Sequence, residues 1–101
     1  MVHVIASISV KAGSRARFLE IFKGNVPVVK AEPGYIEYRP TVDVDSGLPP
    51  QQKDADTVVI IEKWESVEAL RLHLATPHMA AYREKVKDLV VKVSLKVLQD
   101  A

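Results

Sequence analysis

The chain of 101 residues contains no cysteine. This absence excludes disulfide bonds, thiolate catalysis and metal centres held by cysteine, and it is compatible with a reducing compartment. An excess of one charge is also missing, because 14 basic and 13 acidic residues leave a formal net charge of +1. Arginine-rich patches interleaved with aromatic residues do not occur either, so we expect no nucleic-acid partner.

Long hydrophobic runs are absent as well. No apolar stretch approaches the ~20 residues that a membrane-spanning helix requires, so we expect no membrane partner. The first predicted strand begins almost at Met1, without the basic segment and apolar core of a secretory signal. We therefore expect a cytoplasmic protein. Its length is close to the common size of a single hydrophobic core, so residues 1–101 are predicted to form one domain.

Motifs built on glycine or on a serine nucleophile are missing too. The glycines stand at positions 13, 24, 34 and 47, and they form neither a phosphate-binding loop nor the G-x-G-x-x-G motif of dinucleotide-binding folds. The G-x-S-x-G turn of hydrolases does not occur either. If the protein is an enzyme, we expect it to work without a bound organic cofactor.

Four segments carry the pattern of β-strands. They are residues 2–10, 35–42, 57–64 and 91–97, of which the first and last alternate apolar with polar side chains. The third strand differs, because Val58 to Ile61 are apolar on both faces. Residues 43–56 are polar and contain one glycine and two prolines, so they are predicted to form a long hairpin loop between the second and third strands.

Three segments carry the pattern of amphipathic helices, and each follows a residue that commonly caps a helix. Ser14 precedes a helix with the apolar stripe Phe18, Phe22, Val26 and Val29. Ser66 precedes a short helix with Val67, Leu70 and Leu74. Thr76 and Pro77 begin a third helix, which is expected to present Met79, Tyr82, Val86, Leu89 and Val90 on one side.

The order of these elements is β-α-β-β-α-β, with the second helical section divided in two. This order predicts an α+β fold of the ferredoxin-like type with an antiparallel sheet. Right-handed crossovers place both helical sections on the same face of the sheet. Since the third strand is apolar on both faces, the other face also needs cover. A second copy of the chain is the simplest cover, so we expect a homodimer.

Two of the three histidines stand close together in the segment His73-Leu-Ala-Thr-Pro-His78. Metal-binding histidines of one helix are usually four residues apart, whereas here the spacing is five and Thr76 starts a new helix between them. We therefore expect no metal site. Each histidine is predicted to lie at the edge of an apolar stripe, where an imidazole can meet both a pocket and water. Both are candidate bases, and boundary residues with local hydrogen bonds are the alternative.

Trp64, the only tryptophan, ends the third predicted strand. It fits either a large apolar plug of the core or a wall on which a flat ligand stacks. Glu62 lies on the same strand face, and a carboxylate in so apolar a strand is expected to form a salt bridge rather than to act as an acid or base. Four further residues place a polar group on an element of the predicted core, namely Tyr38, Arg39, Tyr82 and Arg83.

The segment from Glu62 to His78 resembles the antibiotic biosynthesis monooxygenase (ABM) family. In that family a strand ending in E-x-W or E-x-Y is followed by a short helix and the motif H-x-x-[ST]-P-H, as in EKWESVEALRLHLATPH here. Further landmarks agree, namely Gly13 after the first strand and the turn at residues 32–35 before the second. Only the loop 43–56 is longer than usual. The resemblance implies a dimeric α/β barrel, with two ferredoxin-like subunits packed through their sheets.

The family includes cofactor-free monooxygenases of aromatic phenols, quinol monooxygenases, haem-degrading enzymes and an isomerase of a phosphorylated linear dione. Haem-degrading members are marked by an asparagine, a tryptophan and a histidine, and this chain has Ala6, His73 and Arg83 at those places. Haem degradation is therefore not expected. The H-x-x-T-P-H motif is closer to the quinol monooxygenases and the dione isomerase, and it does not choose between them.

The leading hypothesis is a cofactor-independent monooxygenase that oxidises a small quinol or aromatic phenol with molecular oxygen. His73 is the first candidate for the catalytic base and His78 the second. Trp64 is expected to stack on the substrate ring, with Tyr82 or Tyr38 helping to orient it.

Two alternatives remain open from the sequence. One is an isomerase or lyase of a small dicarbonyl substrate, in which a histidine would move a proton between carbons and Arg39 or Arg83 would hold an anionic group. The other is a dimeric ligand-binding module without catalysis. Activity that persists without oxygen would favour the isomerase, and a pocket too small for an aromatic ring would favour the binding module.

Overall fold

The computed structural model describes all residues from Met1 to Ala101. Its elements follow the predicted βαββαβ order with the second helical section divided. In chain order they are β1 (Val2–Val10), α1 (Arg15–Lys30), β2 (Tyr35–Thr41), β3 (Thr57–Trp64), α2 (Val67–Leu74), α3 (Pro77–Val86) and β4 (Val90–Leu98). None of the helices is long and apolar enough to cross a lipid bilayer.

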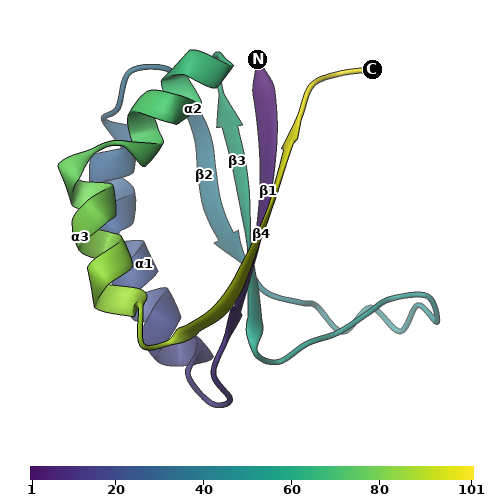
Figure 1. Cartoon of the computed structure of the whole chain (residues 1–101). Coiled ribbons are helices and arrows are strands. Elements are labelled where there is room, and N and C mark those ends of the chain that lie inside the picture. Colours follow the sequence, from purple (N-terminus) through teal and green to yellow (C-terminus); the bar gives the residue numbers. More distant parts are fainter.

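The four strands form one antiparallel sheet in the order β2-β3-β1-β4. All three helices lie against the same face of this sheet, and the other face carries no element of the chain (Figure 1). The predicted ferredoxin-like α+β fold is therefore confirmed. The sheet places β1 and β3 at its centre, where each of them is flanked by a strand on both sides.

The core fills the space between the helices and the central strands. Every second residue of β1 and of β3 is buried, and these residues face the helices. From the helix side, Phe18, Phe22 and Val29 of α1 pack onto them, as the apolar stripe predicted. Phe22 stacks on Tyr38 with ring centroids 5.1 Å apart, so aromatic side chains join α1 to β2.

The ends of the helices follow the predicted caps in two cases of three. The hydroxyl of Ser66 accepts a hydrogen bond from the backbone N–H of Ala69, and that of Thr76 accepts one from Met79. Ser14 occupies the N-cap position of α1, but its side chain makes no capping hydrogen bond. The end of α3 also differs from expectation, because the helix stops at Val86 and Val90 already begins β4.

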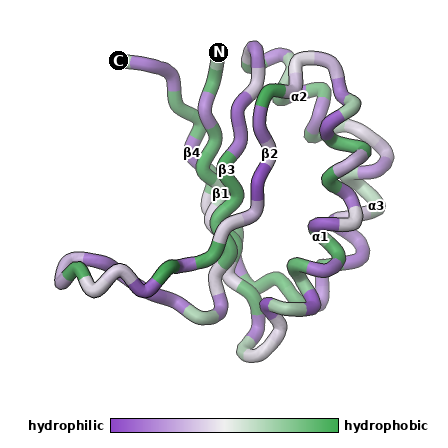
Figure 2. Tube along the Cα trace, turned by 180° about the vertical axis from the view of Figure 1, so that it is seen from behind, coloured by the Kyte–Doolittle hydropathy of each residue, from purple (hydrophilic) through white to green (hydrophobic).

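Strand β4 continues the sheet beyond the reach of the helices. Val93 pairs with Ile8 and Leu95 pairs with Ala6, so both face the helix side. Even so, Val93 is 57% and Leu95 49% exposed, because no helix covers this edge. At the far end of β2, residues 42–56 form the predicted long loop, which runs out on the side away from the helices (Figure 1) and mixes hydrophilic with hydrophobic residues (Figure 2).

Candidate active site

A cavity of ≈ 370 Å³ lies between the helices and the sheet. This volume is in the range of small-molecule pockets, about 300–1,000 Å³. Of its 16 lining residues 12 are hydrophobic, and the four polar ones are Glu62, His73, Arg83 and Lys87. Two tyrosines, Tyr38 and Tyr82, add hydroxyl groups to the lining. An apolar slot with a few convergent polar groups is the usual form of a binding site for a small organic molecule.

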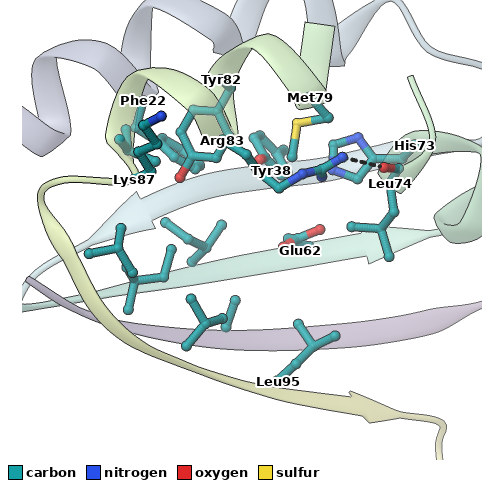
Figure 3. Close-up of a pocket in the computed structure, with 16 residues that line it drawn as sticks. Phe22, Tyr38, Glu62, His73, Leu74, Met79, Tyr82, Arg83, Lys87 and Leu95 are labelled. Carbon is teal, nitrogen blue, oxygen red and sulfur yellow. Dashed lines mark hydrogen bonds between the residues drawn. The ribbon is translucent and has the colours of Figure 1, made fainter. Parts of the chain in front are cut away.

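The cavity has its mouth between α3 and β4. Ala6, Ile8 and Ile60, which form its sheet side, are buried, whereas Val93 and Leu95 of β4 are substantially exposed. Arg83 and Lys87 of α3 are exposed as well. Figure 3 shows Leu95 on β4 across the cavity from α3, with Glu62 between them. A ligand would therefore enter along the uncovered side of β4.

His73 lies at the inner end of this cavity, at the last turn of α2. It was predicted to lie at a half-open edge, but it is only 2% exposed. The turn after α1 covers it, since Nδ1 of His73 lies 2.7 Å from Oε2 of Glu32. Burial lowers the pKa of the imidazole, and the contact with Glu32 opposes this shift. The ring is therefore neutral near pH 7 and can act as a base.

Glu32 is the partner of His73 that the sequence reasoning missed. It belongs to the turn between α1 and β2, and its side chain is only 10% exposed. Its second oxygen, Oε1, lies 3.3 Å from Nε2 of His78. The segment containing Pro33 and Gly34 was recognised as a turn, but nothing in the sequence shows that it folds over residues more than forty positions away. Glu32 brings the two histidines into one hydrogen-bonded group.

His78 lies outside the cavity. Its imidazole faces a polar groove between α1 and α3, where Nδ1 lies 3.2 Å from the side-chain amide nitrogen of Asn25. The ring centroids of His73 and His78 are 6.4 Å apart, with the carboxylate of Glu32 contacting both rings. The structure thus separates the two candidate bases, since His73 lines the cavity and His78 does not.

Glu62 does not form the predicted salt bridge. Its carboxylate instead accepts a hydrogen bond from the indole N–H of Trp64, at 3.0 Å. The neighbouring cation, Lys63, points to the other face of the sheet, because side chains alternate along a strand. Burial without a cation raises the pKa of Glu62 to about 7, against the opposing effect of the Trp64 hydrogen bond. Glu62 is therefore a second group in the cavity that can gain or lose a proton near neutral pH.

Trp64 is fully buried and does not line the cavity. Its indole packs behind His73, with ring centroids 4.6 Å apart, and against the edge of Tyr35. Trp64 therefore fills the core, which was one of the two interpretations of the sequence. It does not form a wall on which a ligand could stack. The aromatic surface that does face the cavity belongs to Phe22, Tyr38 and Tyr82.

Tyr38 stacks on Phe22, Tyr82 meets Phe22 edge to face, and both tyrosines line the same cavity (Figure 3). Burial, together with the negative charge of Glu62, raises the pKa of both phenols. Both hydroxyls therefore stay protonated and can donate hydrogen bonds to an oxygen of a ligand. This arrangement brings together two of the residues singled out from the sequence.

The two arginines named from the sequence lie apart. The guanidinium of Arg83 donates a hydrogen bond to the backbone oxygen of Leu74, at 3.1 Å, and so sits at the cavity mouth (Figure 3). Arg39 pairs with Glu37 and is exposed on β2, where alternation with the buried Tyr38 turns it to the other face of the sheet. Only Arg83 is placed to meet a ligand in this cavity.

Comparison with known proteins agrees with the fold and identifies the family. Residues 1–85 match the family model described as antibiotic biosynthesis monooxygenase. The protein named Probable quinol monooxygenase YgiN, from Escherichia coli K12 and from Shigella flexneri, is 42% identical over 98% of this chain and 97% of its own length.

Solved structures show the same fold. One described as an antibiotic biosynthesis monooxygenase has a TM-score of 0.82 at 24% identity, covering 100% of this chain and 99% of its own. A protein from Nitrosomonas europaea has a TM-score of 0.84 at 21% identity, with coverage of 99% and 98%. Family match, sequence relatives and fold agree over nearly the whole length. The chain belongs to the antibiotic biosynthesis monooxygenase family.

Proposed function

We propose that this protein is a monooxygenase that oxidises a small quinol or aromatic phenol with molecular oxygen and needs no resident cofactor. The observation that carries the proposal is a neutral imidazole, that of His73, at the inner end of an apolar cavity with two phenolic donors. The relative named as a quinol monooxygenase, 42% identical over almost the whole chain, supports the same substrate class.

The chemistry requires little from the protein, because the substrate supplies the electrons. His73 takes the proton of a substrate hydroxyl, and the resulting anion reduces O₂. One oxygen atom enters the ring and the other leaves as water, so that a phenol and O₂ give a quinone and water, and a quinol and O₂ give a hydroxyquinone and water. Tyr38 and Tyr82 donate hydrogen bonds that hold the substrate oxygen, and the apolar walls keep bulk water out.

The remaining residues contribute around this centre. Arg83, at the mouth, is the group that meets a polar substituent of the substrate. Trp64 supports the imidazole of His73 from behind and holds Glu62 in place through its indole N–H. Glu62, whose pKa is raised to about 7, is a second group of the cavity that can hold a proton and pass it to the oxygen that leaves as water.

The test is oxygen consumption on naphthalene-type hydroquinones, with a chelator present and an enzyme-free control for autoxidation. We expect uptake above the control, incorporation of one atom from ¹⁸O₂ into the product, and a loss of at least about 100-fold in kcat for His73→Ala. The matched control is His3→Ala, since His3 is a surface residue paired only with Asp100. Full turnover by His73→Ala would exclude His73 as the base.

Turnover of a dicarbonyl under argon would contradict the proposal and favour an isomerase of the same fold. No turnover on either panel, together with tight binding of naphthoquinones, would favour a ligand-binding module. Each outcome replaces the oxygenase with one specific alternative.

We also propose that the protein works as a homodimer joined through the face of the sheet that no helix covers. Ile5, Val59 and Ile61 form an apolar group at the centre of this face, because they alternate with the buried residues of β1 and β3. A stripe of this kind on the middle strands is better covered than exposed to water. The site itself lies on the opposite side of the sheet, so each subunit would hold its own cavity.

A further inference from the structure

The carboxylate of Glu32 is shared by two histidines, of which only one reaches the cavity. We propose that Glu32 is a positioning residue: it holds His73 in the tautomer that presents Nε2 to the substrate, and His78 serves only to hold Glu32. This inference deepens the proposed function and rests on it for its catalytic consequence. The positioning itself can be tested without any substrate.

Both oxygens of Glu32 are occupied. Oε2 lies 2.7 Å from Nδ1 of His73, and Oε1 lies 3.3 Å from Nε2 of His78. The carboxylate comes from the turn that follows α1, and its side chain is only 10% exposed. Three separate elements thus meet at one buried carboxylate, which restricts its orientation more than a single partner would.

The hydrogen-bond partners assign the protons of both rings. The amide nitrogen of Asn25 can only donate, so Nδ1 of His78 accepts and Nε2 carries the proton that is donated to Glu32. At His73 the ionised carboxylate can only accept, so Nδ1 carries the proton. The two histidines therefore have opposite tautomers, and the free nitrogen of His73 is Nε2.

The consequence for the reaction follows from the charges. When Nε2 of His73 takes the substrate proton, the ring becomes an imidazolium next to the carboxylate of Glu32, which stabilises it. Without the carboxylate, either nitrogen of His73 could carry the proton, and the basic one need not face the substrate. His78 has no path to the substrate except through Glu32, so it is not a second base.

Other charged groups also face this trio and must be held constant in a test. Glu62 and Tyr38 approach from the sheet, and Arg83 approaches from α3. The variant Glu32→Gln leaves all three in place and changes the charge and the hydrogen-bonding capacity of one side chain. Glu65→Gln is the matched control, because Glu65 lies beside the same turn near Gly34 and has no hydrogen bond or ion pair with a histidine.

The first measurement is ¹⁵N NMR of the histidine rings in the full-length protein without substrate. We expect the wild type to show His73 protonated at Nδ1 and His78 protonated at Nε2. In Glu32→Gln the preference of His73 for Nδ1–H should be lost, while His3, which lies far away on β1, reports no change. Glu32→Asp keeps the charge, so it should restore part of the preference. A wild-type His73 protonated at Nε2, or an unchanged tautomer in Glu32→Gln, would overturn the proposal.

The second measurement uses any quinol that the wild type oxidises. Glu32→Gln should lower kcat by up to about 10⁴-fold, the loss known for a base left in the wrong tautomer, with little change in KM. The acidic limb of its pH profile should move to lower pH, because loss of the carboxylate lowers the pKa of the imidazolium. His78→Asn should lower kcat to a smaller extent, and Glu65→Gln should leave kcat and the pH profile unchanged.

The two measurements separate the two proposals. If no quinol is oxidised but the tautomers are as expected, the proposed function fails and the role of Glu32 stands. If quinols are oxidised and Glu32→Gln retains full kcat and an unmoved pH profile, the proposed function stands and the role of Glu32 fails.

Discussion

Glu62 is the carboxylic acid whose surroundings move its ionisation into the neutral pH range. It is a carboxylic acid buried under aromatic rings, held by one neutral donor, with no cation in contact. Burial raises the pKa from 4.5 to about 7. Since the unfolded chain ionises at the lower pH, the stability that the neutral carboxyl contributes is fully present below pH 4.5 and is lost as the pH rises to about 7.

The pH dependence of stability should therefore differ between the wild type and Glu62→Gln. Glutamine keeps the acceptor for the indole N–H of Trp64 but does not titrate. Between pH 4.5 and pH 8 the wild type should lose up to about 3 kcal/mol more unfolding free energy than the variant. Urea denaturation of both proteins at several pH values measures this difference. Parallel curves would mean that Glu62 ionises normally in the folded protein.

The residues that carry the site could be predicted from the sequence only in part. His73, Tyr38 and Tyr82 were identified because a polar side chain on an apolar face is unusual, and all three line the cavity. The partner of His73 could not be identified, since Glu32 reaches it through a turn that is distant along the chain. For Trp64 the sequence left two positions open, because a large aromatic residue at the end of a strand fits the core and the wall of a ligand site equally well.

At the scale of elements, the turn at residues 31–34 fixes the position of the site. Gly34 has φ +81°, and its carbonyl accepts a hydrogen bond from the backbone N–H of Glu65, at 2.9 Å. A Cβ at this position would lie 2.5 Å from the Cβ of Ala69, so only glycine lets the turn approach α2 this closely. That approach is what places Glu32 against the last turn of α2.

Gly34→Ala should therefore destabilise the protein by about 2–3 kcal/mol, the sum of a left-handed backbone and a steric clash. Gly47→Ala is the matched control, because Gly47 also has a positive φ but meets nothing within 4 Å. It should cost only the backbone part, about 1 kcal/mol. Midpoints of urea denaturation provide both values. Equal losses would show that the contact with Ala69 relaxes freely.

The elements themselves were easier to predict than the site. Period-2 and helical patterns located all four strands and all three helices, because burial on one face requires those periods. The same reliance on periodicity misplaced the end of α3. Val86, Leu89 and Val90 continue an apolar pattern, but Val90 continues it as the first residue of β4. A periodic pattern does not show where the chain changes from helix to strand.

At the scale of the whole molecule, the two faces of the sheet differ, because the helices cover only one of them. The helices bury one face, and the other carries Ile5, Val59 and Ile61 among polar side chains. Ile5 and Ile61 are direct cross-strand partners, so they form a contiguous apolar pair at the centre of the sheet. We place the two-fold axis of the proposed dimer at this pair, where it would pack against the same pair of a second copy.

Ile61→Lys should therefore separate the dimer into folded monomers, because the interface would enclose two unpaired ammonium groups near its axis. Sedimentation velocity over a range of concentrations should show the wild type as a dimer and the variant shifted to the monomer, with unchanged far-UV circular dichroism. Leu72→Lys is the matched control, since Leu72 is exposed on α2, away from this face, and should leave the dimer intact. A variant that remains dimeric would place the interface elsewhere, and the uncovered edge of β4 would then be the surface to change next.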